Sequence, residues 1–135
     1  MANKKGVNGV INIPSSLKGS FFRHWLMFLA PFHHLTEREM DVATAFIKHR
    51  YLLSKVIKDE AVLDQVTMSE ETKHKIKEEC NITTPHFQVI MGKLRKSRII
   101  IDNKINPKFI PKNIEEGDEC FKLLLYFDLN EESNK

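Results

Sequence analysis

The 135-residue sequence predicts one mainly α-helical domain with a small β wing and an extended N-terminal arm. The strongest observation is a pair of capped helices within residues 69–98, separated by a turn of about four residues, which is helix-turn-helix spacing. A β-branched run and a turn signal follow the second helix directly, as a wing would. We therefore expect a winged helix-turn-helix-like domain over residues 21–129, with a flexible arm over residues 1–20 and a polar tail over residues 130–135.

Charge is distributed unevenly along the chain, although the net charge is only +3. Residues 81–112 contain seven basic residues and one acidic residue, whereas residues 113–135 contain two basic and seven acidic residues. A basic block beside an acidic tail favours an anionic partner for the block. The alternative is an ordinary solvated surface with a solubilising tail.

Neither the cysteines nor the apolar segments indicate secretion or a membrane. Cys80 and Cys120 are far apart and belong to no disulfide framework, so we expect reduced thiols in a cytosolic protein. The apolar stretch Trp25–Phe32 is too short to span a membrane and contains Pro31. We expect no membrane partner.

The N-terminal third combines a polar arm with an aromatic helix. In the arm, which is rich in Gly, Asn, Ser and Lys, Val10, Ile11 and Ile13 could form a short strand or a docking strip. Residues 21–34 then place apolar side chains near helical spacing and almost all round the predicted helix. Such a helix must be buried, either in its own core or against a partner. The candidate partner-interface residues are Phe21, Phe22, Trp25, Phe28 and Phe32.

A capping box marks the start of the next helix. The Thr36 hydroxyl and the Glu39 carboxylate would each accept a hydrogen bond from an otherwise unpaired backbone N–H. An apolar stripe that includes Val42 and Phe46 continues this helix to about Leu53. A short helix around Asp59–Val66 is expected to follow.

The central unit begins with a helix that Ser69 caps and that runs to about Cys80. Asn81 can adopt the left-handed backbone conformation that ends helices, and Ile82 in the turn would pack between the two helices.

The second helix of the unit is capped by Thr84, has Pro85 at its first position and runs to about Ser97. Its inward face is predicted to hold Phe87, Ile90, Met91 and Leu94.

The opposite face of this helix and the wing carry the candidate DNA-binding residues. Gln88 offers a donor and an acceptor to a base edge, and Gly92 permits close approach of another surface. The lysine and arginine side chains of this face, together with Arg98 after the helix, can reach phosphates. The full candidate set is His86, Gln88, Val89, Gly92, Lys93, Arg95, Lys96, Lys104 and Lys108. The alternative is a basic face that is merely solvated, in a helix-turn-helix that serves assembly.

The wing is predicted from the residues after the second helix. Ile99–Ile101 favours a strand, residues 102–103 form a turn, and residues 104–110 return as a second strand that Pro107 restricts to an edge. Phe121–Leu129 is a third apolar strand or a short helix, and its central aromatic residues favour the strand.

No motif in the sequence indicates catalysis. There is no glycine-rich phosphate loop, and the histidines are scattered without metal-ligand spacing. Glu37, Glu39 and Asp41 cluster at a helix N-terminus, where the helix dipole explains them. We expect a non-enzymatic protein with no catalytic residues, no metal site and no cofactor.

Several segments resemble known families. Lys104–Pro107 resembles the wing of winged-helix plasmid replication proteins, and Leu35–Glu39 resembles the start of response-regulator-type DNA-binding helices. More widely, Leu35–Arg50, Thr67–Ile101 and Ile105–Pro111 resemble small proteins encoded by crAss-like tailed bacteriophages of gut bacteria. This resemblance implies a phage origin, but it does not choose between a regulator and a structural protein.

The sequence is therefore compatible with two functions. The first is a phage winged helix-turn-helix regulator that binds duplex DNA in the host bacterial cytoplasm. The second is a component of the phage virion, such as a head–tail connector ring, that uses the fold for assembly with other virion proteins. In either case we expect a homo-oligomer.

Overall fold

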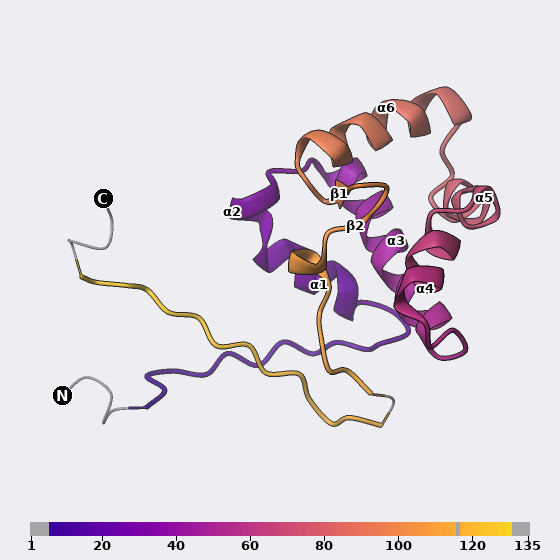
Figure 1. Ribbon diagram of the computed structural model, residues 1–135. Helices are drawn as coiled ribbons and strands as arrows, with labels where there is room; N and C mark the ends of the chain where they lie inside the picture. The colour runs from indigo at the N-terminus through magenta and orange to yellow at the C-terminus, as the bar shows by residue number, and fades with distance from the viewer. Residues whose placement is uncertain (1–5, 116, 131–135) are drawn as a thin grey trace.

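The computed structural model describes residues 6–115 and 117–130 (Figure 1). It is mainly helical with a small antiparallel sheet, an arrangement compatible with a winged helix. The elements are α1 (Phe21–Phe28), α2 (Ala30–His33), α3 (Glu37–Ser54), α4 (Glu60–Thr67), α5 (Glu70–Glu79), α6 (Thr84–Lys96), β1 (Ile100–Ile101), β2 (Lys104–Ile105) and the 3-10 helix η2 (Pro107–Phe109). Residues 1–5 of the expected arm and 131–135 of the expected tail lie outside the described residues. None of the described helices is both long enough and apolar enough to cross a membrane.

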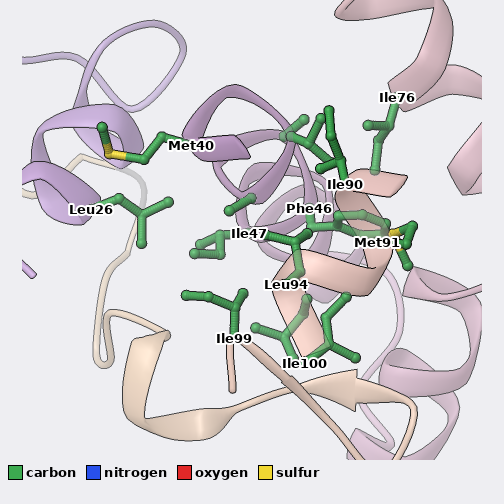
Figure 2. Packing of buried hydrophobic residues seen from close by; sticks show 14 of the residues in the cluster. Leu26, Met40, Phe46, Ile47, Ile76, Ile90, Met91, Leu94, Ile99 and Ile100 are labelled. Atoms are coloured by element: carbon green, nitrogen blue, oxygen red, sulfur yellow. The ribbon is translucent and has the colours of Figure 1, made fainter. Parts of the chain in front are cut away.

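Helix α3 lies at the centre of the domain and contacts α1, α4, α5 and α6. The predicted capping box is confirmed, because Thr36 Oγ1 accepts a hydrogen bond from the Glu39 N–H and the Glu39 carboxylate accepts one from the Thr36 N–H. Figure 2 shows Phe46 and Ile47 of α3 packed among side chains from α6 and the segment that enters the hairpin. The core thus joins the central helix α3 to α6 and the hairpin.

The aromatic N-terminal segment forms two helices rather than the single helix that its spacing predicts. Helix α1 ends at Phe28, and Leu29 separates it from α2. A continuous helix would bring the Pro31 ring against the carbonyl of Met27, four residues earlier, so the chain breaks there. His34, with a φ of 55°, then ends α2.

Helices α5 and α6 form where the sequence predicts the two helices of the central unit, with one change at the second cap. Ser69 caps α5, and Asn81 has a φ of 53°, as expected for a left-handed terminator. The cap of α6 is Thr83 rather than Thr84, because the Thr83 hydroxyl accepts a hydrogen bond from the His86 N–H. The Pro85 ring therefore stands at the second helical position, where a missing N–H still costs nothing.

The hairpin after α6 is confirmed but is shorter than predicted. Ile100 pairs with Ile105, and Ile101 pairs with Lys104. The two turn residues between them, Asp102 and Asn103, have φ values of 50° and 56°, which suits a tight hairpin turn. The second strand stops at Ile105 because the chain turns into η2 at the next residues.

The third strand predicted over residues 121–129 is wrong. The structure describes these residues and assigns them neither strand nor helix. Leu124, Leu125, Tyr126 and Phe127 are exposed there. A strand requires a neighbour for its backbone N–H and C=O groups, and no described strand lies beside this segment.

Candidate nucleic-acid interface

Helix α6 is anchored on one face and open on the other. Phe87, Ile90, Met91 and Leu94 are buried, as predicted, and Figure 2 shows the last three directed into the core. Ile82, in the turn before the helix, is also buried. Because the buried face fixes the rotation of the helix about its axis, the residues of the other face point away from the core. Helix α6 itself lies at the edge of the domain (Figure 1).

The outward face of α6 holds most of the predicted DNA-binding residues. His86, Gln88, Lys93, Arg95 and Lys96 are exposed, and so is the Val89 side chain. Gly92 is half-buried, and a Cβ added there would meet no atom within 4 Å. The surface beside Gly92 is therefore open to a partner, as the sequence predicts.

The positive charge of this region is concentrated at the C-terminal end of α6. Lys93, Arg95 and Lys96 lie in its last turn, and the helix contains no acidic residue. The preceding helix α5 differs because it contains ion pairs. The Lys73 ammonium group lies 3.6 Å from the Glu70 carboxylate, and the Lys75 ammonium group lies 3.6 Å from the Glu71 carboxylate. Acidic and basic side chains thus offset each other within α5, whereas the basic side chains of α6 have no acidic residue in their own helix.

The base of the hairpin extends the basic surface. Arg98 follows α6 with a φ of 65°, which turns the chain sharply into β1. Its side chain and that of Arg95 line a shallow pocket of about 330 Å³ together with the turn residues Asp102 and Asn103. Lys104 lies at the start of β2 and is half-buried. Arg95, Arg98 and the turn of the hairpin therefore lie close together at the end of α6.

Lys108 is the one candidate that the structure separates from this surface. It lies in η2, and its ammonium group is 5.7 Å from the centre of the Phe32 ring on α2. In Figure 1, η2 lies next to α1 and apart from α6. The sequence placed Lys108 on a long second strand, and the early end of that strand moves it to the α1–α2 side of the domain.

A residue outside the candidate set, Arg38, holds the end of α5. One of its guanidinium nitrogens donates to the Cys80 carbonyl at 2.7 Å, and another donates to Asp41 at 3.2 Å. Arg38 thus joins α3 to the C-terminal end of α5, just before the turn that leads to α6. No local sequence signal could identify this contact, because its partner lies 42 residues away.

The aromatic residues proposed as a partner interface divide into two groups. Phe22 is buried in the core against Tyr51, and the Trp25 indole N–H donates to the Phe109 carbonyl at 2.8 Å. Phe21 packs edge-on against Phe22. These three residues serve the fold of the chain itself.

The other two aromatic residues remain outside the core. Phe28 is 42% exposed and Phe32 is 62% exposed, and Met27 beside them is 54% exposed. These exposed apolar side chains on α1 and α2 are available to a partner.

Neither cysteine forms a reactive centre or a metal site with its neighbours in the described part of the chain. Burial raises the pKa of the Cys80 thiol, and the nearby Glu79 and Asp41 carboxylates raise it further. A thiol with a raised pKa is a poor nucleophile at neutral pH. Within residues 6–115 and 117–130, no three His, Cys, Asp or Glu side chains are grouped so that they could hold a metal ion.

Comparisons with known proteins add nothing to this geometry: no family model, no curated protein and no solved structure matches the chain.

Proposed function

We propose that this protein is a non-enzymatic winged helix-turn-helix protein of phage origin that binds duplex DNA through the exposed face of α6. The observation that supports the proposal most is the arrangement of α6. Its apolar face is buried in the core, while its outward face carries Gln88, open space beside Gly92 and three basic side chains without an acidic neighbour in the helix. An α-helix with such a face fits the major groove of DNA.

Each part of the face has a role in this proposal. Gln88, near the N-terminal end, reads a base edge as both donor and acceptor, and Val89 contacts a thymine methyl group. Lys93, Arg95 and Lys96 neutralise phosphates that flank the groove. Arg98 and the hairpin contact the neighbouring backbone. In this proposal the arm from Lys5 to Lys18 contacts phosphates, and the protein acts as a regulator in the host cytoplasm.

The test is the salt-dependent binding of a fluorescent mixed-sequence DNA duplex, measured by anisotropy. Lys93→Ala combined with Lys96→Ala should weaken binding at low salt and lower the slope of log affinity against log salt by about 2, one unit for each lost phosphate contact. A control with the same net charge, Lys58→Ala combined with Lys75→Ala, removes two lysines from elsewhere in the domain and should leave the slope unchanged. Equal affinity and equal slope for the two double variants would contradict the proposal.

A second candidate function is a virion structural component, such as a ring at the head–tail connection. The exposed side chains of Met27, Phe28 and Phe32 support it, because aromatic residues and methionine are enriched at protein–protein interfaces. Light scattering distinguishes the two functions. A large closed oligomer that ignores duplex DNA, and that is also present in purified phage particles, would favour the structural component.

A further inference from the structure

A run of apolar side chains near the C-terminus has no cover in the structure. We call residues 121–129 the C-terminal strip. Its first residue, Phe121, is held against the domain, with its ring centre 5.2 Å from that of Phe21 and 5.6 Å from that of Trp25. Beyond this anchor the side chains face water, with exposed fractions of 59% for Leu124, 83% for Tyr126 and 85% for Phe127. The domain therefore fixes one end of the strip and leaves the rest available.

A second apolar run, near the N-terminus, is equally uncovered. We call residues 7–13 the N-terminal segment. Val7, Val10 and Ile11 are between 66% and 88% exposed, and no helix or strand is assigned there. In Figure 1 the N-terminal segment and the C-terminal strip leave the helical domain towards the same side. Both contain residues that favour strands, and neither is paired with a described strand.

The charges around the two runs are complementary. Residues 1–20 contain three lysines and no acidic residue. Residues 113–135 contain seven acidic and two basic residues. A strip from one copy and an N-terminal segment from another would therefore attract each other, whereas two strips or two N-terminal segments would repel.

We propose that the C-terminal strip of one copy pairs as a β-strand with the N-terminal segment of a second copy of this chain. The pairing would form hydrogen bonds between backbone N–H and C=O groups that are not bonded to any described strand. It would also remove the apolar side chains of both runs from water. Each copy offers one strip and one segment, so the exchange can close a dimer or continue around a ring. This interaction uses neither α6 nor the hairpin, so it can be tested apart from the α6 face. The apolar residues 7–13 that it uses lie between Lys5 and Lys18, the basic residues of the arm that would contact phosphates.

The test is a complementation experiment on the full chain, with mass measured by light scattering. One variant, Val10→Asp with Ile11→Asp, places charges in the N-terminal segment and keeps the strip. The other, Leu125→Asp with Phe127→Asp, places charges in the strip and keeps the N-terminal segment. We expect the unchanged chain to form an oligomer and each variant alone to be a monomer. An equal mixture should form a complex of two chains, because one intact strip then meets one intact segment.

The control variant is Val56→Asp, which changes a residue that is 78% exposed between α3 and α4 and should leave the oligomer intact. Circular dichroism should show the same helix content in all variants, so that a loss of mass is not a loss of fold. A monomeric unchanged chain, a mixture that stays monomeric, or a variant that remains oligomeric alone would each overturn the proposal. None of these results would affect the anisotropy test of the α6 face, so the two proposals fail separately.

Discussion

At the scale of single residues, local chemistry explains the positions that the sequence predicts well. Thr36 and Ser69 cap helices because each hydroxyl accepts a hydrogen bond from a backbone N–H three residues ahead, within one short stretch of sequence. Arg38 lies at the other extreme, because its contact with the Cys80 carbonyl depends on the packing of two helices. The same packing half-buries the Cys80 side chain, whereas Cys120 is exposed.

The two cysteines should therefore differ in reactivity. With iodoacetamide at pH 8, Cys120 should be alkylated first and Cys80 more slowly, because the Cys80 thiol is half-buried and its raised pKa leaves less thiolate. Peptide mass spectrometry over time gives the two rates, and their difference should disappear in denaturant. Similar rates in the native protein would contradict the burial of Cys80.

The raised pKa also predicts how Cys80 affects stability with pH. The native state holds the thiol proton more tightly than the unfolded state, whose pKa is close to the ordinary value of 9.0. The contribution to the free energy of unfolding is therefore fully present below that value and is lost as the pH rises through the raised native pKa. Cys80→Ala should be less sensitive to alkaline pH than the unchanged chain in urea unfolding.

At the scale of elements, helices that carry their own start and stop signals could be predicted, and elements that need a distant partner could not. Helices α3, α5 and α6 follow from caps and apolar spacing. The spacing of apolar residues does not predict the break at Leu29, because it contains no information on the steric clash of Pro31 in a continuous helix. The strip over residues 121–129 has strand composition, but composition cannot supply the neighbouring strand.

The capping box of α3 allows a direct test at this scale. Thr36→Ala should lower the free energy of unfolding by about 1 kcal/mol, because the Glu39 N–H loses its acceptor. Thr36→Ser, which keeps the hydroxyl, should recover most of that loss. Urea unfolding followed by circular dichroism measures both, and an equal cost for the two substitutions would show that the hydroxyl does not act as a cap.

At the scale of the whole molecule, one core connects the central helix α3 with α5, α6 and the hairpin. Phe46, Leu94 and Ile99 belong to this core and come from α3, α6 and the start of the wing. The exposed face of α6 is therefore presented by a domain whose parts are packed together. The candidate surface could be predicted from the sequence for α6, where helical spacing sets the face, but not for Lys108, whose position depends on how the chain leaves β2.

A substitution that shortens a buried core side chain should therefore destabilise the whole domain. Leu94→Ala should cost about 2–5 kcal/mol, because the side chain is fully buried and its loss leaves a cavity between α6 and the rest of the core. Leu52→Ala, at a residue that is 42% exposed on α3, should cost less than about 1.5 kcal/mol. Urea unfolding should show a single transition for both variants. A separate early transition for Leu94→Ala would indicate that α6 unfolds independently of α3.

The exposed C-terminal strip also makes the protein prone to aggregation. A short run of leucines and aromatic residues with one basic residue and one acidic residue, Lys122 and Asp128, is the kind of sequence that stacks with identical copies into insoluble fibres. The acidic residues before it, Asp118 and Glu119, act as gatekeepers, since stacked identical strips would bring these carboxylates close together. High salt weakens that protection by screening the carboxylates. The protein should therefore store best in dilute buffer above neutral pH, and precipitation on adding salt would originate from the strip.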